Sequence, residues 1–178
     1  MKNVAFVGKM AAGKSYYASL LRQELIDKGI NSNIVHISYK IKELAVELFG
    51  MKDKDRDLLQ KIAGKMRDID EDVWIKYLIY YVKKEGKLPF IIDDVRFKEE
   101  VDLLKESFDL LVIRIESDDI YRRSVYRAKY GKDPTEKELN DVTETSSGDI
   151  TPDLILTNDY TKNSAKANIS RILEALQI

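Results

Sequence analysis

The stretch that decides the fold is Gly8-Lys9-Met10-Ala11-Ala12-Gly13-Lys14-Ser15, which matches the pattern G-x-x-x-x-G-K-[ST] at every defined position. It follows an apolar run, Asn3–Val7, and precedes a segment whose apolar residues have helical spacing. Successive backbone N–H groups at the start of a helix form a concave site for an anion, and the helix dipole adds positive charge there. In this strand-loop-helix setting the motif predicts a binding site for a nucleoside triphosphate.

Each defined position of this loop has a chemical reason. Gly8 and Gly13 let the backbone turn tightly around phosphate groups. The ammonium group of Lys14 reaches the β- and γ-phosphates, and the hydroxyl group of Ser15 binds Mg²⁺, the expected cofactor. We therefore predict that ATP contacts the whole loop. The predicted ATP-binding residues are Gly8, Lys9, Met10, Ala11, Ala12, Gly13, Lys14 and Ser15.

Strand and helix signals alternate along the rest of the chain. Short apolar runs predict strands, and apolar residues at i, i+3, i+4 and i+7 predict helices. Such alternation predicts an α/β domain in which helices flank a five-stranded parallel sheet. The predicted strands are Asn3–Val7, Ile34–Ile37, Phe90–Ile92, Leu110–Ile115 and Leu154–Leu156. The predicted helices begin after Lys14, Asp118, Asp133 and Ser164 and near Ile41 and Val73.

The composition limits the size, partners and location of the protein. Its 178 residues suit a single domain, residues 1–178. The 30 Lys and Arg residues against 31 Asp and Glu give a net charge of −1, which argues against a nucleic-acid polymer or a membrane as partner. The lack of cysteine excludes a disulfide scaffold, a thiolate zinc site and a cysteine nucleophile. No apolar run suits a transmembrane helix or a signal peptide, so we expect a cytoplasmic protein.

A second strand ends in carboxylates. The run Phe90-Ile91-Ile92-Asp93-Asp94 is apolar until its last two residues, as expected of a strand that brings a Mg²⁺-binding carboxylate to a phosphate loop. Side chains alternate along a strand, so only one of the two carboxylates should reach the site. The strand itself leaves the choice between Asp93 and Asp94 open.

Charge is unevenly distributed between residues 120 and 149. Residues 120–132 contain five basic residues and no acids, and residues 133–149 contain six acids and one Lys. A solvated helix face followed by an acidic loop explains this pattern. Cations that stabilise a transferring phosphoryl group explain it as well, because arginine binds phosphate through its planar fork. On the second interpretation Arg122, Arg123 and Arg127 act with Lys14 in catalysis, and Arg123 and Arg127 share a helix face.

The residues that follow the carboxylate strand resemble a known family. Asp94-Val95-Arg96-Phe97 followed by Glu100 is similar to the Asp-Val-Arg-Phe-x-x-Glu signature of the phage-type deoxynucleoside monophosphate kinases. The similarity covers nearly the whole chain, in the same order. Its other segments are Ile41-Lys42-Glu43, Leu48-Phe49-Gly50, Arg56 to Arg67, Asp72-Val73-Trp74 and Asp153-Leu154-Ile155 with Asn158-Asp159. The chain departs from the family pattern at Lys40, Lys98-Glu99, Thr143–Ser146 and Tyr160, the last of which replaces a Gly.

The resemblance implies a P-loop nucleotide kinase fold with a helical acceptor-binding insertion near residues 38–82 and an arginine-bearing lid near residues 118–148. The implied reaction is Mg²⁺-assisted transfer of the γ-phosphate of ATP to a deoxynucleoside monophosphate. The motif position favours Asp94 as the carboxylate at the metal, either directly or through water. The resemblance also adds Asn158 to the ATP-binding residues. The implied acceptor-binding residues are Lys42, Arg67, Trp74, Asp94 and Arg96.

Several alternatives remain open. Trp74 lies in an apolar helical stripe, where core packing is more usual than base stacking, and His36 lies on a short apolar strand and is expected to be structural. A P-loop kinase with a hydroxyl acceptor would use Asp93 or Asp94 as its base. A nucleotide-binding module without catalysis is a further alternative. The sequence identifies neither the preferred base and sugar nor the choice between monomer and homodimer.

Overall fold

A parallel sheet forms the centre of the computed structural model, which describes residues 1–139 and 146–178. Its five strands lie in the order β2-β3-β1-β4-β5, and every neighbouring pair is parallel. The strands are β1 (Asn3–Val7), β2 (Asn33–Val35), β3 (Phe90–Ile92), β4 (Leu110–Glu116) and β5 (Leu154–Thr157). The predicted α/β fold and the five predicted strands are confirmed, although β2 ends two residues earlier than expected.

Helices connect the strands. They are α1 (Lys14–Asp27), α2 (Ser38–Phe49), α3 (Arg56–Arg67), α4 (Val73–Lys84), α5 (Lys98–Ser107), α6 (Asp119–Tyr130), α7 (Glu136–Leu139) and α9 (Lys162–Ala175), with a short 3-10 turn at Ser146–Gly148. Within residues 1–139 and 146–178, none of the helices combines the length and the apolar character that a membrane span needs.

Helices α3 and α5 were not predicted. Two predicted helices, those expected after Asp133 and after Ser164, begin at a different residue in the structure. Helix α3 has no fully buried residue, but its apolar residues Leu59, Ile62, Ala63 and Met66 have helical spacing and pack, partly buried, against the core. Asp55 is the N-cap of this helix, and its carboxylate accepts a hydrogen bond from the Leu58 N–H at 3.0 Å. Aspartate is a preferred N-cap residue, so the start of the helix had a signal in the sequence. The last helix is capped by Thr161, whose hydroxyl oxygen accepts from the Ser164 N–H, rather than by Ser164 itself. The helix expected after Asp133 is the four-residue α7.

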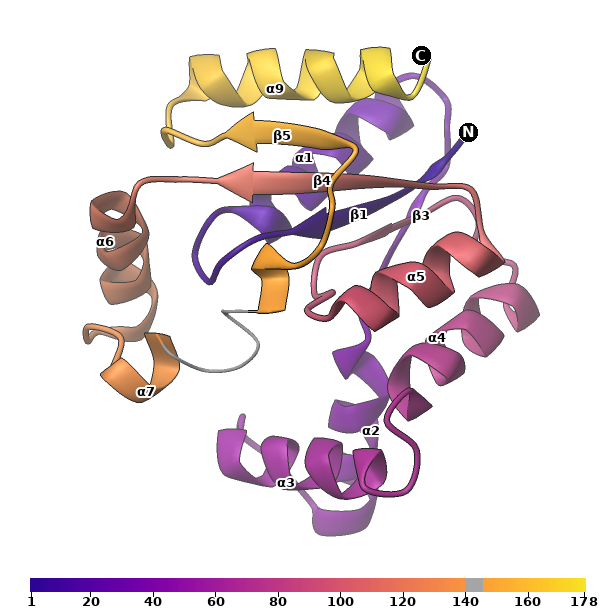
Figure 1. Cartoon of the computed structure of the whole chain (residues 1–178), viewed down its shortest axis with the longest axis vertical. Coiled ribbons are helices and arrows are strands. Elements are labelled where there is room, and N and C mark those ends of the chain that lie inside the picture. Colours follow the sequence, from indigo (N-terminus) through magenta and orange to yellow (C-terminus); the bar gives the residue numbers. More distant parts are fainter. Residues whose placement is uncertain (140–145) are drawn as a thin grey trace.

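The sheet is covered on both faces (Figure 1). One apolar cluster joins Val4 and Phe6 of β1 to Tyr17 and Leu21 of α1 and to Ile169 of α9. The second cluster joins the alternate residues of β1 to helices α2, α4 and α5. Because successive side chains of a strand point to opposite faces, β1 contributes to both clusters and is buried at every position.

The parallel strands place their carboxyl ends at one edge of the sheet, where ligands of α/β folds bind. The phosphate loop follows β1, Asp93 follows β3, Ser117 follows β4 and Asn158 follows β5. In Figure 1, β4 and β5 point toward α6 at this edge. Helices α2 and α3 pack against each other beyond the lower side of the sheet, within the predicted insertion at residues 38–82.

Two glycines should respond to alanine substitution in opposite directions. Gly8 has φ +131°, and a Cβ atom there would lie 2.4 Å from the backbone oxygen of Ile115 in the neighbouring strand. Gly64 lies inside α3, and nothing lies within 4 Å of its Cβ position. We expect Gly8→Ala to lower the free energy of unfolding by about 2 kcal/mol or more. Gly64→Ala should raise it by about 0.5–1 kcal/mol, because alanine loses less backbone entropy in a helix.

Urea denaturation of both variants and the wild type, followed by circular dichroism, measures this pair of changes. Equal effects of the two substitutions would contradict the close approach of the loop to β4.

Candidate active site

The phosphate loop between β1 and α1 is tightly curled. Gly8 and Gly13 have positive φ angles of 131° and 106°, and Ala11 has φ 61°. The ammonium group of Lys14 donates hydrogen bonds to the carbonyl oxygens of Gly8 at 2.6 Å and Lys9 at 2.9 Å, and the residue is only 7% exposed. The loop therefore wraps around a buried positive charge, as a site for polyphosphate requires.

Side chains from distant elements hold the next carbonyl groups of the loop. The guanidinium group of Arg122 donates to the carbonyl oxygen of Met10 at 3.1 Å, and the amide of Asn158 donates to that of Ala12 at 2.9 Å. The hydroxyl group of Tyr160 lies 2.7 Å from the carbonyl oxygen of Ala11. Each carbonyl group from Gly8 to Ala12 thus has a side-chain donor, and the peptide planes are oriented before a ligand binds.

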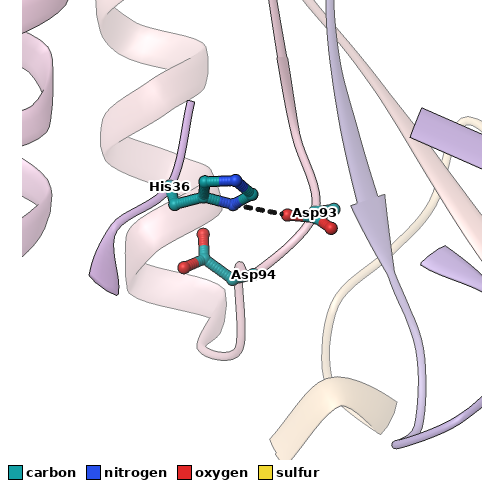
Figure 2. A group of neighbouring side chains, drawn as sticks. All are labelled: His36, Asp93 and Asp94. Carbon is teal, nitrogen blue, oxygen red and sulfur yellow. Dashed lines mark ion pairs between the residues drawn. The ribbon is translucent and has the colours of Figure 1, made fainter. Parts of the chain in front are cut away.

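Asp93 is the carboxylate next to this loop. It is 6% exposed, and its Oδ1 atom lies 2.8 Å from Nδ1 of His36 (Figure 2). Burial raises its pKa, but hydrogen bonds with His36 and Ser15 and the charges of His36 and Lys14 outweigh burial, so the pKa of Asp93 is lowered. Asp93 is therefore an ionised, buried carboxylate beside Ser15 and Lys14.

Asp94, which the motif position favoured for the metal, has a different set of contacts. Its two carboxylate oxygens accept hydrogen bonds from the backbone N–H groups of Ile37 at 2.9 Å and Ser38 at 3.0 Å, where α2 begins. In Figure 2 the Asp94 carboxylate lies below the His36 ring, and the dashed line joins His36 to Asp93 and not to Asp94. The carboxylate that forms a hydrogen bond with Ser15 is thus that of Asp93.

Ser15 and Asp93 fit a Mg²⁺ ion. Mg²⁺ prefers hard oxygen ligands, and a hydroxyl group next to an ionised carboxylate supplies them. His36, Asp93 and Asp94 also offer one ligand atom each within 4.8 Å of one another. His36 was expected to be structural; it forms the ion pair with Asp93, and that hydrogen bond raises the pKa of His36.

The three arginines of α6 have different environments. Arg122 is 8% exposed, contacts Met10 and forms an ion pair with Asp119, and its buried Nε atom has no hydrogen-bond partner among the described residues. Arg123 lines the same cavity as Arg122. Arg127 is 65% exposed and forms a two-pronged hydrogen bond with Asp133, with both N···O distances at 2.9 Å.

A cavity of about 770 Å³ adjoins the phosphate loop. It lies between the loop, the end of β4, α6 and α7, and its size is in the range of small-molecule sites. Its cations are Lys9, Arg114, Arg122 and Arg123, and its acids are Glu116, Asp119 and Glu136. The predicted catalytic cations Arg122 and Arg123 thus face one cavity beside the loop, and Arg127 is not among its lining residues.

Two of the predicted acceptor-binding residues, Arg67 and Arg96, lie near the buried carboxylate of Glu100. The guanidinium carbon of Arg67 lies 5.5 Å from the centre of the Phe97 ring, and the backbone N–H groups of Arg96 and Phe97 donate to the buried carboxylate of Glu100 at 2.8 and 3.1 Å. Burial raises the pKa of Glu100, and these hydrogen bonds and the charge of Arg67 oppose the rise. The Arg67 guanidinium group and the backbone of Arg96 therefore lie near the same buried carboxylate, and the assignment of both arginines to an acceptor site stays a prediction.

The other two candidates differ from each other. Lys42 is exposed on α2, and its charge reaches His36. Trp74 is 3% exposed, and its indole N–H donates to the carbonyl oxygen of Ala63 in α3 at 3.1 Å. Trp74 is thus a core residue that joins α4 to α3, and its assignment to the acceptor site is corrected. Of the acidic stretch, Asp141 and Glu144 lie outside the described residues.

Sequence reasoning missed Arg114 and the contact role of Tyr160. Arg114 lies in the apolar strand β4, and its guanidinium group donates hydrogen bonds to the carbonyl oxygens of Gly148 and Ile150. These two hydrogen bonds connect the segment before β5 to β4. A single charged residue in an apolar strand indicates that the charge has a specific partner, and this signal was present in the sequence. For Tyr160, the only signal in the sequence was that a large side chain stands where the resembled family has Gly.

Comparison with known proteins supports the fold. No family model and no curated protein matches the chain. A sugar kinase from Janibacter sp. HTCC2649 is 15% identical with a TM-score of 0.63, over 100% of this chain and 95% of that chain. A shikimate kinase from Bacteroides thetaiotaomicron is 12% identical with a TM-score of 0.58, over 99% of both chains. The APS kinase of Mycobacterium tuberculosis is 15% identical with a TM-score of 0.54, over 99% of this chain and 98% of that chain. The chain has the fold of the P-loop small-molecule kinases.

The ion pair of His36 with Asp93 should make stability depend on pH. The pKa of His36 is raised in the folded state, so its contribution is complete below the unfolded pKa of about 6.5 and is lost as the pH rises through the folded value. We expect His36→Gln to lower the free energy of unfolding more at about pH 5.5 than at about pH 9. Both conditions lie above the range in which Asp93, with its lowered pKa, takes up a proton.

Urea unfolding of the wild type and His36→Gln, both in EDTA, measures the difference at the two pH values. An equal difference at both values would contradict the ion pair.

Proposed function

We propose that the chain is a Mg²⁺-dependent kinase that transfers the γ-phosphate of ATP to a deoxynucleoside monophosphate. The observation that carries the proposal is the set of charges around one loop. Lys14 lies within it, the ionised Asp93 lies beside Ser15, and Arg122 and Arg123 face the adjoining cavity. Such an arrangement binds a polyphosphate and stabilises the charge that develops on the transferred group.

The chain's own groups would act in three places. The loop and Lys14 would bind the β- and γ-phosphates, and Arg123, from the open side of the cavity, would stabilise the equatorial oxygens in the transition state. Ser15 and Asp93 would hold Mg²⁺, which supplies charge neutralisation between the phosphates when bound. Helix α6 would close over the nucleotides as part of a lid at residues 118–148 and exclude water.

A phosphate acceptor agrees with the second group of cations. Arg67 on α3 lies against the Phe97 ring, and Arg96 is the residue before Phe97, so both belong to elements other than the phosphate loop and α6. A monophosphate arrives ionised, so its transfer requires positioning and charge stabilisation rather than a general base. The motif that contains Arg96 also carries the resemblance to the deoxynucleoside monophosphate kinases.

One observation favours a second candidate, a kinase with a hydroxyl acceptor. Asp93 is a buried, ionised carboxylate with a histidine partner, and such a group can take the proton of an attacking hydroxyl group. The solved structures that share this fold include a shikimate kinase and a gluconokinase from Sinorhizobium meliloti, whose names describe hydroxyl-bearing substrates.

A substrate panel separates these candidates. We expect ATP- and acceptor-dependent ADP release with at least one of the four deoxynucleoside monophosphates, measured in a coupled assay with Mg²⁺. The panel also contains the ribonucleotides, the nucleosides, shikimate and gluconate. Lys14→Ala, checked for folding by circular dichroism, is the control and should be inactive.

Turnover on a hydroxyl acceptor with none on any monophosphate would favour the second candidate. Tight ATP binding without acceptor-dependent turnover would leave a nucleotide-binding module.

The two arginines on one face of α6 should differ in their importance. We expect Arg123→Ala to lower kcat by about 100-fold or more, because cations of this kind act in the transition state. Arg127→Ala should have a smaller effect, because the Arg127 guanidinium is exposed and engaged by Asp133. Lys129→Ala, an exposed cation of the same helix, is the matched control.

Steady-state kinetics of the three variants and the wild type measure the loss of kcat caused by each substitution. Near-native turnover of both arginine variants would refute the assignment of α6 to the lid.

A further inference from the structure

Tyr160 has a backbone conformation that a tyrosine rarely adopts. Its φ angle is 61°, in the left-handed region that favours glycine. Among the described residues, the other non-glycine residues with positive φ are Ala11, in the phosphate loop, and Gln177, near the end of the chain. Two strained residues, 149 positions apart, are thus joined by the hydrogen bond between the Tyr160 hydroxyl and the Ala11 carbonyl. Strain of this kind persists where surrounding contacts over-determine it.

The contacts of Tyr160 form a closed set around the loop. Its hydroxyl group lies 2.7 Å from the carbonyl oxygen of Ala11 and 3.1 Å from the hydroxyl oxygen of Ser117. A phenol has one proton, so donation to Ala11 leaves the Ser117 hydroxyl to donate to the phenol oxygen. The backbone N–H of Tyr160 donates to Oδ1 of Asn158, whose amide nitrogen donates to Ala12. Tyr160 thus links the ends of β4 and β5 to consecutive peptides of the loop.

This linkage sets the orientation of the Ala11 carbonyl. Ala11 has φ 61° and no side chain of its own that can hold such a conformation. The half-buried phenol supplies the missing contact, and burial raises its pKa, which keeps the proton on the donor. A backbone nest binds phosphate well when its peptides are already oriented, because no ordering cost is left for the ligand.

We propose that Tyr160 is a positioning residue for polyphosphate binding, and that it acts through the Ala11 carbonyl rather than by touching the nucleotide base. The inference rests on the proposed binding of ATP at the phosphate loop. The alternative for the same side chain is a stacking platform, since the ring of Tyr121 lies 5.9 Å away at 45°. Positioning requires the hydroxyl group, whereas stacking requires only the ring.

The test compares ATP with inorganic tripolyphosphate, which has no base. Tyr160→Phe keeps the ring and the backbone conformation and removes only the hydroxyl group. Isothermal titration calorimetry with Mg²⁺ should show binding about tenfold weaker for both ligands, the effect of one lost hydrogen bond. The KM for ATP should rise by the same factor, and the KM for the acceptor should not change. Tyr80→Phe, at an exposed position on α4, is the matched control.

A second variant separates positioning from general stability. Tyr160→Gly removes the hydroxyl group and also relieves the left-handed strain, because glycine adopts positive φ freely. We expect its thermal unfolding midpoint to be no lower than that of Tyr160→Phe, while its affinity for both ligands is at least as weak. A merely structural role would make affinity follow stability.

Three results would overturn the inference. Tyr160→Phe with wild-type affinity for both ligands would show that the hydroxyl group is not needed. Weaker binding of ATP alone, with tripolyphosphate unchanged, would assign Tyr160 to the base. A wild-type chain that binds neither ligand would overturn the proposed function as well, and that result is distinguished from the others by the wild-type titration.

Discussion

The structure depends on how the carbonyl groups of the phosphate loop are held. A loop that binds polyphosphate must keep its carbonyl dipoles away from the anion, and this chain holds each carbonyl from Gly8 to Ala12 with a side-chain donor. The donors Lys14, Arg122, Asn158 and Tyr160 come from α1, from α6 and from the turn after β5. The loop thus ties the carboxyl ends of the central strands to α6, and a change in any of these elements reaches the phosphate site.

The charges of the site are paired in a way that leaves the loop cationic. Asp93 is compensated by His36, Ser15 and Lys14, and it lies on the β3 side of the loop. Arg122 and Arg123 lie on the β4 side and face the large cavity. A protein with a net charge of −1 therefore places four cations, Lys9, Arg114, Arg122 and Arg123, around one cavity beside the loop. Small anionic ligands suit such a distribution better than a polymer.

Local patterns predicted most of the fold, and the exceptions, apart from helix α3, have physical reasons. The five strands were predictable because buried parallel strands are apolar runs. Helix α3 is an exception without such a reason, because its apolar residues Leu59, Ile62, Ala63 and Met66 have the helical spacing that predicts a helix. Asp93 and Asp94 are neighbours in the sequence, and only their side-chain contacts show that Asp93 reaches Ser15 and that Asp94 binds the backbone N–H groups where α2 begins. Trp74 had the spacing of a core residue and proved to be one.

The sequence alone determined the phosphate loop, the parallel α/β order and the candidate cations, because these depend on local spacing and on residue chemistry. Only the tertiary structure decided which cations share a cavity and which carboxylate lies beside Ser15. It also showed that Asn158 and Tyr160 form hydrogen bonds with the carbonyl groups of the loop. The contacts of Arg122, Asn158 and Tyr160 with the loop join residues more than 100 positions apart, and their geometry depends on how the sheet brings the strand ends together. Spacing along the chain carries no information about such distances.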